Sequence, residues 1–518
     1  MKPVRWACVA AALGAAAWLL LQPATADLAA QQYRAGLVRE AGLGLWDNGW
    51  FAGHHTPGYS VLFPPLGALI GVRLAGALAA IAASVLFAAI AQDRWGDRAG
   101  TAAGLWFSLG ATAMLVSGRL TFLLGVVFAL AAALALQRAR PAVAAALAVA
   151  TALASPVGAL FLALGAVAWG LAARERRAAA AVVAVAALAP VAALAGLFPE
   201  GGTEPFVASA FWPALAGTAL VAALLPARER VLRIGAGLYA AACVAAFVVA
   251  SPLGGNVTRL GALLAGPVVL GALLAGGRRP ESTSKLALLV VSVLALGYWQ
   301  AFPAVRDVVR SSGDPSTAAA YYAPLLRYLQ REGPASAFRV EIPFTENHWE
   351  GAHVAPDVPL ARGWERQLDR RYGALFYDGT LTAASYRAWL DEHAVAYVAL
   401  PGVPLDYAGR DEARLVAGGL AYLRPVWRNA NWRVYAVRRP AAIVRGAAAT
   451  ITLQPDGFEI RARRAGDALV RVRHTRWWSV TGGRACVERA PGAMTRVRVL
   501  KPGIVRVRAK LLRSACRR

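Results

Sequence analysis

Apolar segments recur from residue 4 to residue 302, and this recurrence constrains the fold more than any other feature. Clusters of basic residues separate the segments, and between neighbouring clusters lies enough apolar chain for two bilayer crossings. The clusters are Arg94/Arg98, Arg138/Arg140, Arg174/Arg176/Arg177, Arg228/Arg230/Arg233 and Arg278/Arg279/Lys285. Two crossings return the chain to the same side, so all five clusters share a side with Lys2 and Arg5. The positive-inside rule makes that side cytoplasmic.

Composition agrees with a protein that crosses a membrane many times. Of 518 residues, 58% are hydrophobic, and the mean hydropathy is +0.47. The first segment, Val4 to Ala24, lacks a clear A-x-A cleavage site, so we interpret it as a retained helix. The formal net charge is +26. Because the positive charge is dispersed along the chain, nucleic acid is not an expected partner.

Counting segments gives about eleven spans. The outer turns are expected near Ser117-Gly118-Arg119, Ala154-Ser155-Pro156, Phe198 to Trp212 and Ser251 to Asn256. The stretch from Pro141 to Ala173 is short for two full spans. Either its helices are short or one is re-entrant, and the spacing of the basic clusters favours a hairpin. The same spacing of basic clusters places the loop from Asp27 to Pro65 outside. An odd total number of spans also places everything after Trp299 outside.

The predicted fold is a mainly α polytopic membrane bundle, followed by an exported α/β domain that ends in a small β-sandwich. The transmembrane domain covers residues 1–302 with a large first outer loop at 27–65, and the exported parts cover 303–442 and 443–518. Pro315 to Gly333 and Ala383 to His393 read as helices, and Val395 to Leu400 as a strand. After residue 445 the chain alternates with period two. Cys486 and Cys516 can pair if the region is exported, but the sequence leaves the pairing open.

The first outer loop opens with an acid. Asp27 begins a plausible short helix, on which Asp27, Gln31 and Arg34 share one face. A carboxylate there can take a proton from a hydroxyl nucleophile, which is general-base work. The alternative is an N-cap, which Asp fills well, and residue chemistry by itself slightly favours that alternative.

The rest of the loop is aromatic and polar. Two Trp residues, a Phe and a Tyr stand near polar groups, which suits stacking on sugar faces, although Trp and Tyr also anchor proteins at membrane interfaces. The tandem histidines can bind a phosphate or a metal, or move a proton. The candidate substrate-binding residues of this segment are Asp47, Trp50, His54, His55 and Tyr59. No metal ligands are assigned, and a divalent metal stays an open alternative.

Three arginines lie near outer ends of spans or inside them. Arg73, Arg119 and Arg259 can each meet the phosphate of a lipid-linked substrate. The alternative for each is that its side chain extends toward lipid headgroups.

The exported part has its own polar and aromatic segments. Glu346 to His353 and Arg362 to Arg371 combine histidines, tryptophans and acids. His348, Trp349 and Trp364 are candidates for binding an acceptor glycan, and the alternative is a domain interface or a charged surface. No P-loop, GxGxxG or zinc-finger pattern is present in the sequence.

This layout resembles the GT-C class of integral membrane glycosyltransferases. The resemblance lies in a first span, an outer loop that opens with Asp27, a short helix and an aromatic, Pro-rich return to the membrane. It implies inverting sugar transfer from a polyprenyl-phosphate donor to a cell-envelope glycan acceptor, with Asp27 as the base. Arg34 and Glu40 match the polar partners on the following helix. Asp27 is followed by Leu28 rather than by a second acid, which departs from many members.

The sequence therefore predicts an enzyme of this kind in a bacterial plasma membrane. Abundant Arg and Ala suggest a GC-rich, actinobacterial-type genome. The predicted topology is multi-pass, with a cytoplasmic N-terminus and an extracytoplasmic C-terminal domain. Two alternatives stay open: a non-catalytic envelope scaffold that binds glycan, and a transporter or flippase. The second is disfavoured because the spans carry few midplane charges and no evident inverted repeat.

Overall fold

The structure is a computed structural model, which describes residues 2–276, 282–333, 337–512 and 514–517. It divides into two compact units, each made of two separate stretches of chain. The first unit contains Met1–Gln31 and Gly58–Val309, and the second contains Gln32–Pro57 and Arg310–Arg518. Of the predicted basic clusters, Arg278 and Arg279 lie outside the described residues.

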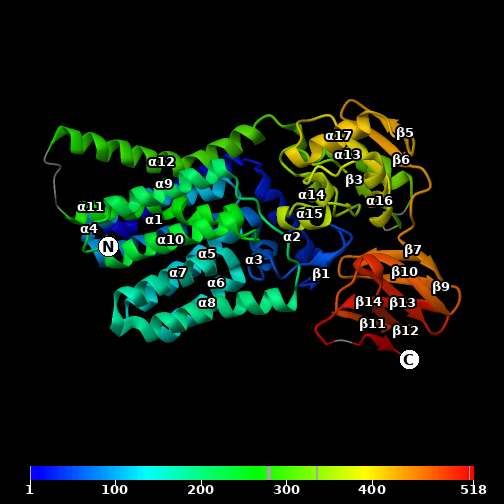
Figure 1. Cartoon of the computed structure of the whole chain (residues 1–518), viewed down its shortest axis with the longest axis horizontal. Coiled ribbons are helices and arrows are strands. Elements are labelled where there is room, and N and C mark those ends of the chain that lie inside the picture. The colour runs from blue at the N-terminus through cyan, green and yellow to red at the C-terminus, as the bar shows by residue number, and fades with distance from the viewer. Residues whose placement is uncertain (1, 277–281, 334–336, 513, 518) are drawn as a thin grey trace. The chain divides into compact units, whose positions relative to one another are not determined.

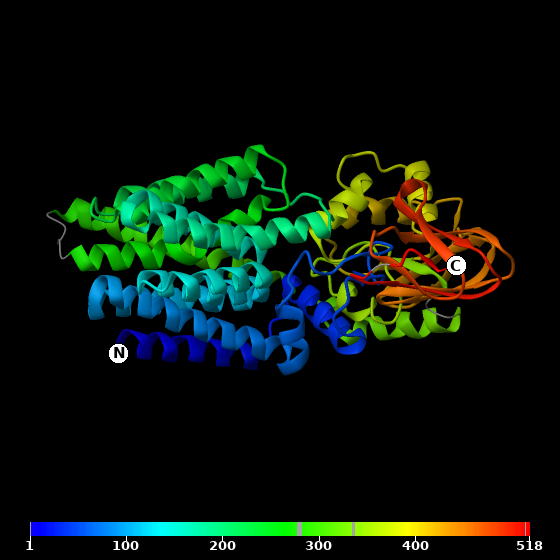
Figure 2. The ribbon, with the colours of Figure 1, turned by 90° about the horizontal axis from the view of Figure 1, so that it is seen from below.

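The first unit consists of apolar helices that run side by side (Figure 1 and Figure 2). They are α1 (Lys2–Leu21), α3 (Phe63–Ile70), α4 (Val72–Val116), α5 (Leu120–Gln137), α6 (Pro141–Ala154), α7 (Pro156–Ala172), α8 (Arg177–Leu197), α9 (Ala208–Leu224), α10 (Arg230–Val248), α11 (Thr258–Gly276) and α12 (Thr283–Ser311). Among the described residues, seven helices are long and apolar enough to cross a membrane. Three shorter apolar helices, α6, α7 and α9, accompany them.

Helix α4 consists of two halves. Its backbone leaves the helical region at Gly96, where φ is 77° and ψ is −178°. Phe87 stacks on Phe107 with ring centroids 4.3 Å apart, so the second half folds back along the first. Helices α6 and α7 are likewise two short helices, joined at Ser155, whose side chain accepts a hydrogen bond from the Gly158 backbone N–H. The count of about eleven spans stays a prediction, because the three shorter helices fall below the usual spanning length.

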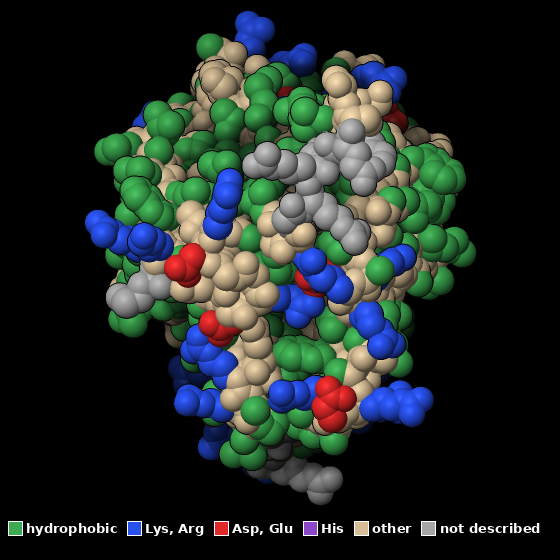
Figure 3. Space-filling view, turned by 90° about the vertical axis from the view of Figure 1, so that its left-hand side faces the viewer, with side chains coloured by type: hydrophobic (Ala, Val, Ile, Leu, Met, Phe, Trp, Pro, Cys, Tyr) green, Lys and Arg blue, Asp and Glu red, His purple; other side chains and the backbone are tan. Residues whose placement is uncertain are grey.

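Ion pairs join the helix ends that carry the basic clusters. Arg138 lies 3.0 Å from Asp93, and Arg94 pairs with Glu229, which immediately precedes α10. The view onto this end of the molecule shows Lys and Arg side chains distributed around apolar surface (Figure 3). Arg94, Arg138 and the start of α10 therefore lie together at one end of the unit, as the spacing predicts. The side of a membrane that this end faces stays a prediction.

The first part of the second unit is a small sheet with helices. Its strands are β3 (Arg339–Glu341), β4 (Val395–Pro401), β5 (Leu423–Arg428) and β6 (Trp432–Val437), in the order β3-β4-β6-β5. Only β3 and β4 are parallel. The helices are α13 (Ala319–Arg331), α14 (Glu350–His353), α15 (Arg366–Tyr372), α16 (Ala383–Glu392) and α17 (Tyr407–Ala417). The helices predicted at Pro315 and Ala383 and the strand predicted at Val395 are confirmed as α13, α16 and β4.

The strand-rich C-terminal region forms two sheets. They have the orders β15-β12-β13-β10-β7 and β11-β14-β9-β8 (Figure 1). The strands are β7 (Val444–Gly446), β8 (Ala448–Gln454), β9 (Gly457–Ala462), β10 (Gly466–Arg473), β11 (Trp478–Gly482), β12 (Ala485–Arg489), β13 (Met494–Val499), β14 (Gly503–Ala509) and β15 (Cys516–Arg517). Inward side chains such as Phe458, Val470 and Val505 form one core. Cys486 and Cys516 form a disulfide that joins β12 to β15.

The middle of the first outer loop belongs to the second unit. Helix α2 (Ala26–Ala41) begins in the first unit, and the hairpin of β1 (Trp46–Asp47) and β2 (His54–His55) follows it. Trp46 is buried in the core of the sandwich, where its ring meets that of Trp478 at 5.2 Å. The Asn48 side chain donates hydrogen bonds to the backbone carbonyls of Gln454 and Gly457. These contacts explain why residues 32–57 group with residues 310–518 rather than with the apolar helices.

Candidate functional site

The first turn of α2 places Asp27. Thr25, immediately before the helix, donates from its hydroxyl to the Val116 carbonyl at 2.8 Å and thereby fixes α2 to the end of α4. Gly118, with φ at 72°, lies so close that a Cβ there would come within 2.6 Å of the Leu28 nitrogen. Only glycine permits this approach without strain. Asp27 therefore stands inside the first turn rather than at the N-cap position that the sequence also allowed.

Two arginines flank Asp27. Its Oδ2 lies 3.9 Å from Nε of Arg119 and 3.8 Å from Nη2 of Arg259. Arg119 immediately precedes α5, and Arg259 lies in the first turn of α11. The three side chains thus come from three helix ends, and the structure brings together residues that are far apart in sequence. Both distances exceed a normal hydrogen bond, so the contacts are ion pairs that leave donor positions for another anion.

The exposure of the three groups differs. The Asp27 side chain is 34% exposed, whereas Arg119 and Arg259 are 15% and 17% exposed. Within the part of the chain that the structure describes, the Arg119 Nε is buried and has no hydrogen-bond partner. A buried donor without a partner is unusual, and a bound anion would satisfy it.

The electrostatic surroundings favour a negatively charged ligand. Burial lowers the pKa of Arg119, Arg259 acts in the same direction, and Asp27 and Asp307 oppose it. A guanidinium has such a high ordinary pKa that it stays charged at neutral pH despite this shift. Arg119, Arg259 and Arg306 together outnumber the carboxylates of Asp27 and Asp307, so the group keeps a net positive charge that attracts an anion such as a phosphate.

Arg73 and Tyr59 take other positions in the first unit. Arg73 donates to the backbone carbonyls of Gln22 and Pro23 and lies over the Trp18 ring, so it holds the end of α1. Tyr59 accepts a hydrogen bond from Gln31, one turn after Asp27 on α2.

The remaining loop candidates lie in the second unit and are mostly buried. Arg34 pairs with Glu365 and lies 5.4 Å from the Trp50 ring centroid, whereas Glu40 is exposed. Trp50 is fully buried and stacks on Tyr33 at 4.2 Å. Its ring fills the space that a Cβ at Gly363 would occupy. These contacts favour a packing role for Trp50, and sugar binding by it stays a prediction.

Asp47 and the tandem histidines form polar contacts inside the second unit. Asp47 accepts hydrogen bonds from the Tyr33 hydroxyl and the Gly49 backbone N–H, and its Oδ2 lies 3.8 Å from His54 Nδ1. Burial raises the pKa of Asp47. The His55 Nε2 lies 2.8 Å from the Thr475 hydroxyl of the sandwich. All of these contacts lie within the second unit.

The proposed acceptor residues are also largely packed. His348 stacks on Trp364 with centroids 3.4 Å apart, and its ring nitrogens lie 3.7 Å from Glu350 and 3.6 Å from Asp406. Burial alone would raise the pKa of Asp406, but His348 and Arg366 hold it well below its ordinary value. Trp349 is 3% exposed. An acceptor role for these three residues stays a prediction.

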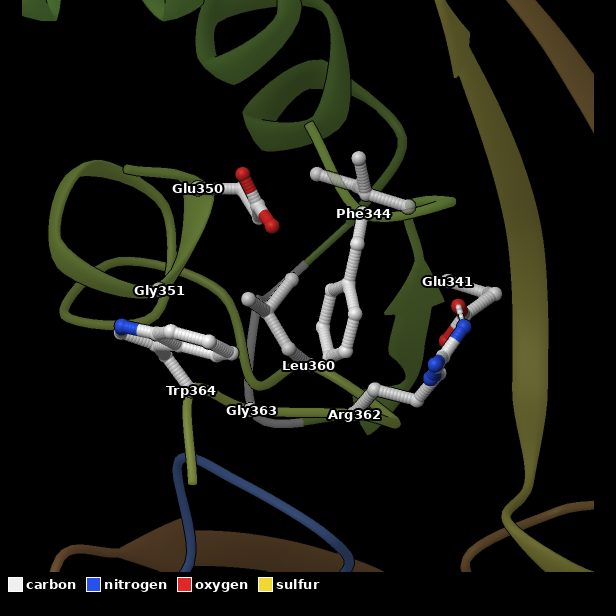
Figure 4. Close-up of a pocket in the computed structure, with 9 residues that line it drawn as sticks. Glu341, Phe344, Glu350, Gly351, Leu360, Arg362, Gly363 and Trp364 are labelled. Carbon is white, nitrogen blue, oxygen red and sulfur yellow. Dashed lines mark ion pairs between the residues drawn. The ribbon is translucent and has the colours of Figure 1, made fainter. Parts of the chain in front are cut away.

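A narrow hollow beside them is lined by charged side chains (Figure 4). Glu341, Phe344, Glu350, Arg362 and Trp364 line it, and it is too tight to hold a water molecule. Arg362 bonds to Asp369 and Glu412 and lies 3.9 Å from Glu341. This buried ionic cluster belongs to the interior of the domain rather than to a ligand site.

Comparison with known proteins adds a structural likeness. The chain is similar to an archaeal oligosaccharyltransferase. The crystal structure of the Archaeoglobus fulgidus enzyme in its apo form is 13% identical in sequence and has a TM-score of 0.46. The match covers 76% of this chain and 69% of that chain. No known family profile and no curated protein matches the sequence. A likeness this distant does not assign an activity to the chain.

One buried residue escaped the sequence analysis. Arg473, at the end of β10, donates to the Phe51 carbonyl and to His393 Nε2, and its guanidinium lies 3.7 Å from the Tyr372 ring centroid. It thereby joins the loop, the α/β part and the sandwich. In the sequence it looks like one more outward arginine in an alternating strand. No local signal marks it as buried.

Proposed function

We propose that the chain is a membrane glycosyltransferase that moves a sugar from a polyprenyl-phosphate donor to a cell-envelope acceptor. The observation that carries the proposal is the partly exposed Asp27 carboxylate between Arg119 and Arg259. The resemblance of the helical layout to the GT-C class agrees with it. The alternatives of a scaffold or a transporter gain no comparable support from a particular contact.

The chemistry assigns a separate task to each group. Asp27 accepts the proton of an acceptor hydroxyl, whose oxygen then attacks the anomeric carbon of the donor sugar. The bond between that carbon and the phosphate oxygen breaks, and the polyprenyl phosphate leaves with the electron pair. Arg119 and Arg259 stabilise the negative charge that develops on the leaving phosphate. Attack from the face opposite the phosphate inverts the configuration of the sugar.

The arginines also supply a reason to propose that no metal takes part at Asp27. A divalent cation beside Asp27 would stand close to two guanidiniums and be repelled by both. Among the described residues, no three His, Cys, Asp or Glu side chains are grouped to hold a metal ion. The positive charge that a metal would contribute to the leaving group is available from the arginines.

The proposal is tested with the full chain in lipid nanodiscs. The protein is incubated with a set of radiolabelled polyprenyl-phosphate sugars and with envelope glycan as acceptor, and polyprenyl phosphate release and glycan labelling are measured. The expected result is release coupled to labelling for at least one donor. Folded protein that transfers no sugar from any donor contradicts the proposal.

A further inference from the structure

The C-terminal sandwich carries an uneven share of the charge of the chain. Residues 443–518 hold 18 of the 55 Lys and Arg residues but only 4 of the 29 Asp and Glu residues. These residues thus carry a formal net charge of +14, more than half of the +26 of the whole chain, which corrects the expectation that the positive charge is dispersed along it. Even if every carboxylate of this region paired with a cation, most of the basic side chains would remain without a partner carboxylate from the same region.

Strand register brings three turns to one end of the sandwich. Val499 of β13 pairs with both Gly466 of β10 and Ala485 of β12. In the other sheet, Gly503 of β14 pairs with Ala462 of β9. The turns that link β9 to β10, β11 to β12 and β13 to β14 therefore share an end, which we call the distal end. Its turns are residues 463–465, 483–484 and 500–502.

The distal end is basic and exposed. Arg463 and Arg464 occupy the first turn, Arg484 the second and Lys501 the third, and all four are exposed. Asp467, two residues after the first turn, is the acidic residue nearest in sequence to the distal turns. It lies 4.0 Å from Arg496 and 3.6 Å from Arg498, so its charge is already shared by two other arginines.

The opposite end of the sandwich is covered by the outer loop. There the Arg473 backbone N–H donates to the Ala52 carbonyl at 2.9 Å, and the Asn48 backbone N–H donates to the Pro455 carbonyl at 3.0 Å. One end of the sandwich is thus used to hold residues 32–57. Within the second unit, these loop contacts do not involve the distal end, which is therefore exposed.

We propose that the distal end binds an anionic polysaccharide, a chain with repeated carboxylate or phosphodiester groups. Guanidinium groups match both kinds of anion geometrically. Each exposed contact is weak, but four cations on three separate turns suit a polymer that presents charges at intervals better than one small anion.

The positions of further cations favour a polymer over a flat bilayer. Exposed Arg498 lies on the five-stranded sheet and exposed Arg461 on the four-stranded sheet. The cations therefore continue from the distal end onto both outward faces. A bilayer surface can meet only one of these faces, whereas a flexible chain can follow both. The choice of a polysaccharide over nucleic acid rests on the proposed function, because a sugar transferase works beside sugar polymers.

The test compares two full-length variants that lose the same charge, in nanodiscs of neutral lipid. The distal variant replaces Arg463, Arg464, Arg484 and Lys501 with Gln, and the control variant replaces the exposed residues Arg424, Arg428, Arg433 and Arg489 with Gln. Binding to polygalacturonate, to single-stranded DNA and to anionic vesicles is measured at low and high salt, with neutral dextran as the uncharged polymer. The Asp27→Asn protein is measured in parallel.

The distal variant is expected to bind polygalacturonate at least about tenfold more weakly, because four attractive charges are lost from the contact. The control variant and Asp27→Asn are expected to bind within about twofold of the wild type, with affinity that falls as salt rises. Equal weakening in both charge variants would overturn the proposal, since net charge alone would then explain binding. Stronger distal-dependent binding to vesicles or to DNA than to polygalacturonate would overturn it in favour of that partner. Loss of transfer in Asp27→Asn with intact polymer binding separates this surface from the proposed reaction.

Discussion

Arg119 Nε lies 3.9 Å from Asp27 Oδ2, although the two residues are separated by three apolar helical segments in the chain. Arg259 reaches the same carboxylate oxygen at 3.8 Å from a third helix end. Asp27, the proposed general base, thus lies between two guanidiniums and next to a position that can hold an anion.

Replacing either arginine with Gln is expected to slow sugar transfer. Arg119→Gln and Arg259→Gln each remove one donor from the leaving phosphate, and loss of one such donor lowers kcat by about 100-fold in comparable sites. Arg73→Gln is the matched control, because Arg73 bonds to backbone carbonyls at the end of α1. Steady-state transfer assays measure the three variants. Equal rates for all three would remove the arginines from the mechanism.

Chelation is expected to leave transfer intact. The guanidiniums supply the positive charge near Asp27, so treatment with EDTA changes the rate by less than about twofold. Transfer is measured before and after dialysis, and then after magnesium or manganese is added back. A rate that EDTA abolishes and that either metal restores contradicts this prediction.

Trp46→Ala is expected to destabilise the second unit by about 3–5 kcal/mol, because it leaves a large cavity in the sandwich core. Trp46 is 2% exposed and packs against Trp478 and Phe458. Leu512→Ala is the control, since Leu512 is 92% exposed and its loss changes stability by less than about 0.5 kcal/mol. Thermal or denaturant unfolding measures both. If the two variants unfold alike, the loop is not part of the core of the unit.

Stability of the second unit is expected to fall as the pH rises. Burial raises the pKa of Glu412 to about 7, and burial together with Glu412 raises that of Glu341 well above its ordinary value. Between the ordinary carboxyl pKa of about 4.3 and these higher values, the folded state binds more protons than the unfolded state. The stability that the Glu412 proton provides is complete below about pH 4 and is lost as the pH rises through about 7, and the Glu341 proton acts in the same direction.

Glu412→Gln isolates this effect, because a carboxamide does not titrate. Its unfolding free energy is expected to change less steeply than that of the wild type between about pH 5 and about pH 8. His393, whose pKa burial and Arg473 hold below its ordinary value, is present in both proteins and cancels in the comparison. Identical pH slopes would show that Glu412 keeps an ordinary pKa.

The sequence was sufficient to predict features that depend on local pattern. The apolar periodicity located the helices, the basic clusters predicted which helix ends lie together, and Asp27 was expected on a short helix. Arg119 and Arg259 stand out in the sequence because a charge at the end of a span or inside it is costly and often functional. Their convergence on one carboxylate depends on helix packing, which no local pattern encodes.

The position of the outer loop could not be predicted in the same way. Trp46 and Asn48 are fixed by Trp478, Gln454 and Gly457, some 400 residues further along the chain. A buried aromatic in a loop looks in the sequence like an exposed one. In each turn of the distal end the sequence has a basic residue close to a glycine: Arg463 before Gly466, Arg484 after Gly483 and Lys501 before Gly503. The sequence does not show the strand register that brings these turns to one end of the sandwich.

The most direct test of the account is Asp27→Asn, with transfer and donor binding measured on the same protein in nanodiscs. The substitution keeps the size of the side chain and removes the base, so transfer is expected to fall by about 100-fold or more while donor binding is retained. Asp93→Asn, which changes an acid at the other end of the helices, is expected to transfer at the wild-type rate. A folded Asp27→Asn protein that transfers sugar as fast as the wild type would contradict the account.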